Sequence, residues 1–285
     1  MATIKDIKKR ISSVRNTQQI TKAMKAVAAA KLRRAHDAAV EARPYAEKMR
    51  ELLSNLSARV SEDSHPLLIE REEKRIDVLL VTTDRGLCGA YNSNVLRLAE
   101  NFRADQREKE LTFRFVGRKG SEYFRRREVD AMDDGPVTWH ATPDELASDA
   151  AGRLIGRFLN GESDAAYIVY SRFRSALSQV PTAARIIPVE PSETDDEQQL
   201  TEYLLEPSIG DLLSNLLPKN VEVQVYQALL EATAGEHGAR MTAMESATNN
   251  ASDLISDLTL QMNRARQAAI TKELLEVIST AEALG

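Results

Sequence analysis

A glycine-bearing stretch in the middle of the chain has residue types that could hold a phosphate group. The segment 82–92, TTDRGLCGAYN, places Gly86 and Gly89 between a β-branched apolar run and a helical segment. Backbone N–H groups at such a strand-to-helix turn can bind phosphate at the helix N-terminus. The stretch lacks the third glycine of a dinucleotide fingerprint and the Lys-Ser/Thr pair of a phosphate loop. We therefore expect both glycines to permit a tight structural turn.

The remaining reactive side chains form no catalytic or metal-binding pattern. Cys88 is the single cysteine, which excludes an internal disulfide framework, and the four histidines have no ligand spacing. No carboxylate pair lies in an apolar setting, and no nucleophile has a base nearby. We expect Cys88 to be a small buried hydrophobic residue, and we expect no catalytic residue, cofactor or metal.

Charge is distributed unevenly along the chain, although the net charge is only −5. Residues 1–36 contain ten Lys or Arg residues against one acid, Asp6, whereas residues 186–206 contain seven acids and no base. A basic helix can be a merely solvated face, or it can attract an acidic protein surface or a nucleic acid. The pattern alone leaves these possibilities open.

The elements that would carry these groups begin with a long amino-terminal helix. From Ile4 to Val60, a seven-residue template with alternating spacings of 3 and 4 meets apolar residues at every position except Gln18, Thr21 and Lys25. A 3.5-residue apolar repeat of this length predicts a left-handed supercoil with a partner helix. The apolar positions are Ile4, Ile7, Ile11, Val14, Ala28, Leu32, Ala35, Ala39, Ala42, Ala46, Met49, Leu53, Leu56 and Val60.

The simplest partner is the other end of the same chain, where no proline follows Pro218. Two separate coiled coils remain possible. The many alanines indicate a close approach of the two helices. The apolar face predicted for the second helix comprises Met244, Ala247, Ala251, Leu254, Leu258, Met262, Ala265 and Ala269.

Between the helical ends, strands and helices alternate. This order predicts a mostly parallel, Rossmann-like sheet covered by helices. The predicted strands are 75–83, 111–116, 165–170 and 183–189, and the predicted helices are 91–103, 121–127 and 143–160.

The expected fold class is thus α/β plus a long antiparallel, left-handed coiled coil. We predict a coiled-coil helix over 1–60, a Rossmann-like domain over 75–190 and a second coiled-coil helix over 207–285. No apolar run approaches the ~20 residues that span a bilayer, and no signal-peptide core opens the chain. These features favour a cytoplasmic protein.

Four stretches of the sequence resemble the gamma subunit of bacterial F-type ATP synthases, in the same order along the chain. Ala90 stands where many relatives have a second glycine, and the cysteine-bearing insertion of chloroplast relatives is absent, so thiol regulation is not expected. The stretches are 11–24 (ISSVRNTQQITKAM), 83–89 (TDRGLCG), 236–251 (EHGARMTAMESATNNA) and 263–273 (NRARQAAITKE).

The resemblance implies the central-stalk rotor of a proton-translocating ATP synthase, with no bond chemistry of its own. Its partners would be the hetero-hexameric ring of alpha and beta subunits, the epsilon subunit and the membrane c-ring, with no nucleic acid. The chain would be peripheral, at the cytoplasmic face of the plasma membrane, and attached through other subunits. Turning the shaft would change each beta subunit's nucleotide site in sequence.

The resemblance also implies which residues contact the partners. Arg266 and Gln267 would contact a beta-subunit loop, and Tyr203 and Glu206 would lie near the c-ring. Weaker, distributed attraction to the ring would come from Lys8, Lys9, Arg10, Arg33 and Arg34.

The end of the second helix forms a separate candidate site. If both helices leave the domain at a similar level, the longer one overhangs the shorter by about 30 Å at 1.5 Å per residue. A lone helix with a wide apolar arc is marginal in water, so we expect the ring to enclose it as an apolar bearing, although the end could also fold back or fray. The bearing residues are Ile270, Leu274, Leu275, Val277 and Ile278.

Two other classes of protein remain open from the residues. An α/β nucleotide-binding enzyme with a helical arm would bind a ligand at the Gly86/Gly89 turn. An RNA-binding protein with a basic coiled-coil arm would show affinity that falls steeply with salt.

Overall fold

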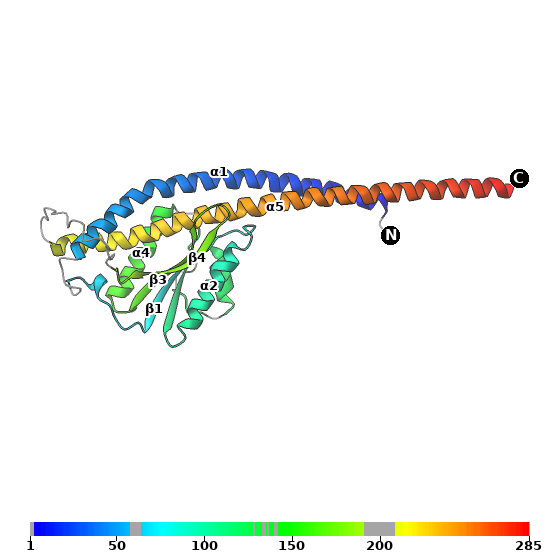
Figure 1. Ribbon diagram of the computed structural model, residues 1–285. Coiled ribbons are helices and arrows are strands. Elements are labelled where there is room, and N and C mark those ends of the chain that lie inside the picture. The colour runs from blue at the N-terminus through cyan, green and yellow to red at the C-terminus, as the bar shows by residue number, and fades with distance from the viewer. Residues whose placement is uncertain are drawn as a thin grey trace. The chain divides into compact units, whose positions relative to one another are not determined.

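The computed structural model describes residues 3–57, 64–127, 129–132, 135, 137–139, 142–190 and 209–284 (Figure 1). The chain divides into two compact units. The terminal unit comprises Met1–Ala28 and Met241–Gly285, and the central unit comprises Ala29–Arg240. Two long helices, α1 (Ile4–Ser57) and α5 (Ile209–Leu284), each contribute one segment to both units.

The predicted heptad positions of α1, which we call the seam, lie on the side of the helix that is buried or half-buried. No described seam residue is exposed, and Ile7, Ile11, Ala28, Ala35 and Ala46 are all buried. The exposed residues fall between them, as the 3.5-residue repeat requires.

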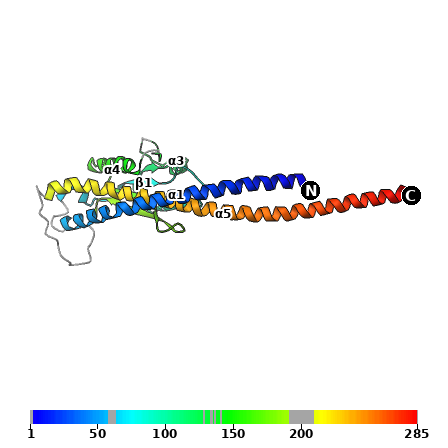
Figure 2. The same ribbon diagram turned by 90° about the horizontal axis from the view of Figure 1, so that it is seen from above.

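In the terminal unit the two helices pack antiparallel. Ile7 and Ile11 of α1 form a cluster with Leu258 of α5, and further along α1 Thr21 meets Thr248. The numbering therefore falls along α5 as it rises along α1. Both views show the two segments side by side, with the end of α5 extending beyond the start of α1 (Figures 1 and 2).

One part of the predicted α5 seam is wrong. Leu254 is 45% exposed, and Ile255 packs in the cluster in its place. Thr248 likewise makes the contact to α1 one position after Ala247. The face follows alternating spacings of 3 and 4 from Met241, which include Ile255 and pass Leu254 by.

Two of the three polar seam positions of α1, Thr21 and Lys25, lie beside polar residues of α5. The hydroxyl groups of Thr21 and Thr248 are 2.7 Å apart, and Lys25 Nζ lies 2.6 Å from Glu245 Oε1. The Thr248 hydroxyl also donates to the Met244 carbonyl. Polar side chains within a seam fix register, because a one-turn slip would leave them against apolar neighbours.

The central unit contains a four-stranded sheet in the order β2-β1-β3-β4. Strands β1 (Arg75–Val81), β2 (Glu110–Val116) and β3 (Ala165–Phe173) are parallel, whereas β4 (Gln179–Ile187) pairs antiparallel with β3. The short connection 174–178 makes this last pair a hairpin.

Helices cover both faces of this sheet. One face packs against α2 (Tyr91–Asp105) and α3 (Arg118–Arg125), and Val78 and Leu80 of β1 lie in that core. Leu79 and Val81 point to the other face, which is covered by α4 (Pro143–Leu159) and by the central-unit segments of α1 and α5. Burial on both faces explains the apolar run 78–81 of β1.

Local signals define the smaller helices. Thr142 and Glu145 form a capping box at the start of α4, with Pro143 in the first turn. A short 3-10 helix, Pro66–Leu68, precedes β1 and contributes Leu67 to the core. The predicted fold class is confirmed: the terminal helices pack together, and an α/β domain lies between them in sequence.

The corrected seam gives a direct test. Replacing Ile255 with alanine should lower the free energy of unfolding by about 1–2 kcal/mol, because a partly buried side chain leaves the contact with Ile7 and Ile11. Leu254→Ala, one residue away and exposed, should change it by less than about 0.5 kcal/mol. Urea unfolding, with hydrogen exchange of the α1 amides, measures both. Equal effects would mean that Ile255 does not belong to the seam.

Candidate functional site

The loop after β1 is held from several sides. The Thr83 N–H donates to Asn92 Oδ1 at 3.1 Å, and Asn92 Nδ2 donates to Thr83 Oγ1 at 2.8 Å and to Cys88 Sγ at 3.3 Å. The Asp84 carboxylate accepts backbone N–H bonds from Arg118 and Trp139, both at 3.0 Å. These groups serve the loop itself, which supports the structural interpretation of the turn.

Only one of the two glycines in the turn is needed for its backbone conformation. Gly89 has φ 58°, whereas Gly86 has no positive φ. Leu87 also lies in the left-handed region, at φ 63°, which is uncommon for a residue with a side chain. The expectation that both glycines permit the turn therefore holds for Gly89 alone.

The loop is fastened to α5. Arg240 donates from Nη2 to the Gly86 carbonyl at 3.2 Å and forms an ion pair with Glu236 at 2.7 Å. Tyr91, just after the turn, donates from its hydroxyl to the Ala232 carbonyl at 2.8 Å. Two sequence motifs that are far apart in the chain, 83–89 and 236–251, thus meet here, which sequence reasoning did not predict.

Two glycines of α5 allow this helix to lie close to Tyr91 and to the β3–β4 turn. A Cβ on Gly235 would lie 3.0 Å from the Tyr91 ring, and one on Gly238 would lie 3.1 Å from the Ala176 backbone in the β3–β4 turn. Glycine lowers the stability of a helix interior, so its presence here indicates contact that a side chain would obstruct.

Burial shifts the pKa of several groups beneath the loop. It raises the pKa of Glu236, against the opposing effect of Arg240, and it lowers the pKa of His237 to about 4. It also raises the pKa of the Cys88 thiol. A protonated, buried thiol is a poor nucleophile, in keeping with the predicted packing role of Cys88.

The predicted cationic contacts are all exposed. Lys8, Lys9 and Arg10 lie on α1 in the terminal unit, and Arg33 and Arg34 lie on α1 in the central unit. Within the described part of the chain, none of the five forms an ion pair. Arg266 and Gln267 are exposed on α5 of the terminal unit, again with no side-chain partner among the described residues.

The end of α5 has no covering helix within the described terminal unit. The cluster with α1 reaches Met262 and Ala265. Beyond it, the five predicted bearing residues are between 50% (Ile270) and 66% (Val277) exposed. At 3.6 residues per turn they span about 160° of the helix circumference.

The predicted c-ring contacts cannot be placed. Tyr203 and Glu206 lie outside the described residues. Two further observations concern the described residues only: no group of His, Cys, Asp or Glu could hold a metal ion, and no helix is long and apolar enough to cross a membrane.

The class of protein is defined by two long terminal helices that pack together, an α/β domain between them in sequence and an uncovered helix end. A family model described as ATP synthase matches residues 3–284. The "ATP synthase gamma chain" of Geotalea daltonii is 48% identical over 286 residues, which cover 100% of this chain and 99% of that one. The gamma chain of Pelotomaculum thermopropionicum is 46% identical over 288 residues, with 100% of both chains covered. The chain belongs to the ATP synthase gamma chain family.

Solved structures show the same fold. A chain of the Euglena gracilis mitochondrial ATP synthase, in a structure titled OSCP/F1/c-ring, has a TM-score of 0.68 at 22% identity, covering 99% of this chain and 94% of that one. A chain of the central stalk and c-ring of the Tetrahymena thermophila enzyme has a TM-score of 0.59 at 24% identity, covering 80% and 99%.

The link between Arg240 and Glu236 predicts a pH-dependent loss of stability. Arg240→Met should lower the free energy of unfolding by about 1–3 kcal/mol at neutral pH, because the Glu236 carboxylate is left buried without its partner. A raised folded-state pKa means that the folded chain holds the proton more tightly. Stability from protonation is therefore present below the ordinary carboxyl pKa and is lost as pH rises through the raised value.

The deficit of Arg240→Met should accordingly shrink in acid. The control is Glu236→Gln combined with Arg240→Met, which has no carboxylate at position 236. Its deficit should change less with pH, and the remaining change comes from His237, whose pKa Arg240 also lowers. Denaturant unfolding across the acid-to-neutral range measures both. A single variant whose deficit does not change with pH would contradict the role assigned to Glu236.

Proposed function

We propose that this chain is the rotor of the central stalk in a proton-translocating F-type ATP synthase and couples c-ring rotation to conformational change in the alpha–beta ring. Membership of the gamma chain family supports the assembly, and the uncovered end of α5 is the single observation that carries the mechanism. The chain performs no bond chemistry; catalysis belongs to the beta subunits whose nucleotide sites it deforms.

The uncovered end of α5 requires a partner. Isolated helices of this length are marginal in water, and a wide apolar arc promotes association. A collar of apolar residues in the alpha–beta ring would bury that arc. Apolar contacts are not directional, so such a collar would allow the helix to turn without breaking specific bonds at each step.

The polar contacts to the ring would come from two adjacent residues of α5. Arg266 offers a planar fork of donors suited to a carboxylate, and Gln267 offers a donor and an acceptor. Their exposure and their lack of described internal partners leave both available for a loop of the beta subunit. Lys8, Lys9, Arg10, Arg33 and Arg34 add weaker attraction to acidic ring surfaces.

The base of the rotor completes the proposal. Tyr203 and Glu206 would lie near the c-ring, beside the epsilon subunit, and cross-linking from cysteines introduced there to c subunits tests this position. The chain would then be peripheral to the plasma membrane, on its cytoplasmic side, and held there through other subunits.

The polar contacts are tested by a double alanine variant. Arg266→Ala with Gln267→Ala should lower coupled ATP turnover of the assembled enzyme about tenfold, because charge-assisted hydrogen bonds contribute about 1.5–3 kcal/mol and 1.4 kcal/mol corresponds to tenfold. Gln261→Ala with Arg264→Ala is the matched control, since both residues are exposed on the same helix. Unchanged turnover in a fully assembled Arg266/Gln267 variant would show that these residues do not take part in coupling.

The apolar bearing is tested by comparing charged substitutions with apolar ones. Leu275→Asp or Ile278→Asp should weaken assembly or coupling far more than Leu275→Met or Ile278→Met, because an apolar collar tolerates methionine and would bury an unpaired carboxylate. Subunit stoichiometry and ATP-driven proton pumping measure the two effects. Equal behaviour of the aspartate and methionine variants would show that no apolar collar surrounds this end.

A further inference from the structure

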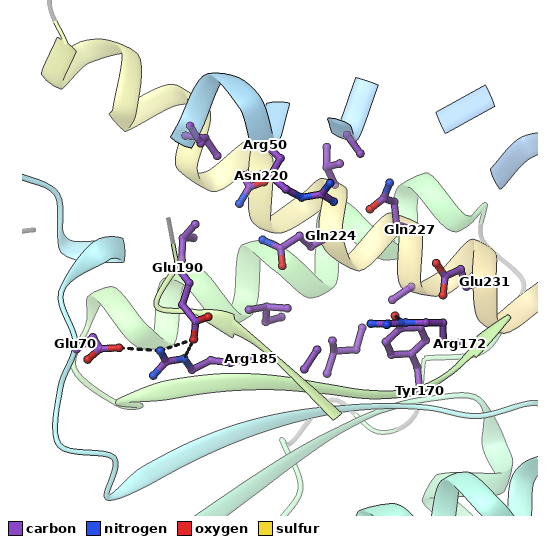
Figure 3. Close-up of a pocket in the computed structure, with 18 residues that line it drawn as sticks. Arg50, Glu70, Tyr170, Arg172, Arg185, Glu190, Asn220, Gln224, Gln227 and Glu231 are labelled. Carbon is purple, nitrogen blue, oxygen red and sulfur yellow. Dashed lines mark hydrogen bonds and ion pairs between the residues drawn. The ribbon is translucent and has the colours of Figure 1, made fainter. Parts of the chain in front are cut away.

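A cavity of about 1070 Å³ that is partly open to solvent lies in the central unit, between the sheet and the two long helices (Figure 3). Its apolar surface includes Ile168 of β3, Ala184 and Ile186 of β4, and Val223 and Ala228 of α5. This volume slightly exceeds the 300–1,000 Å³ typical of small-molecule sites. The rotor function makes no use of it.

One polar stripe of α5 faces this cavity. Asn220, Gln224, Gln227 and Glu231 follow spacings of 4, 3 and 4 and therefore share one side of the helix. The neighbouring residues Val221, Val225, Leu229 and Ala232 are buried apolar side chains. Polar residues at helical period within an apolar stretch are a signal that sequence reasoning missed.

One group in this stripe is buried without a partner. Glu231 Oε2 is buried with no hydrogen-bond partner among the described residues, and Asn220 is only 8% exposed. Buried polar groups are normally satisfied, so Glu231 Oε2 indicates a missing polar partner in the cavity.

Two guanidinium groups are available there. Figure 3 shows Arg50 of α1 next to Asn220, Gln224 and Gln227, and Arg172 of β3 beside the Tyr170 ring and Glu231. Arg172 donates from Nε to the Tyr170 hydroxyl at 3.4 Å, and neither arginine forms an ion pair among the described residues.

The third arginine of the cavity is already neutralised. Arg185 forms ion pairs with Glu70 at 2.7 Å and with Glu190. Burial raises the pKa of Glu231, against the opposing effect of Arg172. Among the arginines that line the cavity, Arg50 and Arg172 are the two that form no ion pair among the described residues.

We propose that this cavity binds a small organic molecule that carries an oxyanion, either a carboxylate or a phosphate. Arg50 and Arg172 bind the oxyanion, since guanidinium groups match both oxyanions in a bidentate way. The carboxamides of Asn220, Gln224 and Gln227 bind other polar atoms of the ligand, and its apolar body lies on Ile168 and Ile186.

The test uses the full chain and three probes with one aromatic ring each. Phenyl phosphate and benzoate carry the two oxyanions, and benzyl alcohol is the neutral control. Titration calorimetry should show saturable binding of at least one oxyanion, with benzyl alcohol about tenfold weaker or more. Whichever oxyanion binds more tightly identifies the ligand class. No saturable binding of either, or equal binding of benzyl alcohol, would overturn the proposal.

Variants locate the binding. Arg50→Gln with Arg172→Gln should weaken oxyanion binding about tenfold or more, whereas Arg97→Gln, an exposed arginine on α2, should not. Gln227→Glu adds a negative charge at nearly constant shape and should abolish binding, whereas Gln19→Glu, exposed on α1, should not. Circular dichroism checks that each variant folds. Wild-type affinity in the cavity variants contradicts the proposal.

The last measurement repeats the binding test with the assembled complex. Binding of the same probe to the complex supports a small-molecule site. Loss of binding on assembly would overturn the proposal, because it would show that a partner chain fills the cavity.

Discussion

Burial of one narrow seam between α1 and α5 governs the terminal unit, because these two helices have no other protein there on which to bury apolar surface. Small residues such as Ala28 and Ala251 line much of the seam, which permits a close approach of the two backbones. The polar pairs Thr21–Thr248 and Lys25–Glu245 then fix the register. Register in turn determines where pairing ends on α5, and so which residues remain uncovered. The exposed end of α5 is thus a consequence of the seam and of the unequal helix lengths.

The hydrophobic repeat of the long helices was the part of the fold that could be predicted from sequence. A 3.5-residue repeat is a local property, and it identified the buried face of α1 along its whole described length. Errors arose where two neighbouring residues were both apolar, as at Leu254 and Ile255, since hydrophobicity alone cannot choose between them. The start of β4 was also misjudged: the strand begins at Gln179 and contains Pro181, a residue that argues against a strand unless it lies at a sheet edge. The edge position is a tertiary property, so the short hairpin and the antiparallel pairing were not predictable.

The candidate sites also differ in how far the sequence could predict them. Exposure of Arg266, Gln267 and the cations of α1 follows from their position on a helix, and the sequence was sufficient to expect it. The contact between Arg240 and the Gly86 carbonyl depends on how α5 crosses the sheet. No local pattern encodes that contact, although the resemblance had identified both segments. The polar stripe from Asn220 to Glu231 had a periodic signal, but its meaning depends on the cavity that Arg50 and Arg172 share with it.

Helix continuity explains how such a chain could transmit force along its length. α5 is one helix of 76 residues that begins in the central unit and ends in the terminal unit. Within the central unit it is held by Arg240, by the Tyr91 hydroxyl and by the close approach at Gly235 and Gly238. A torque applied to the sheet therefore reaches α5 through several short contacts, which share the force. Beyond Arg240 the torque passes along the unbroken backbone hydrogen bonds of the helix. The stiffest fastening is thus needed on α5 just before it leaves the central unit, which is where Glu236 and Arg240 lie.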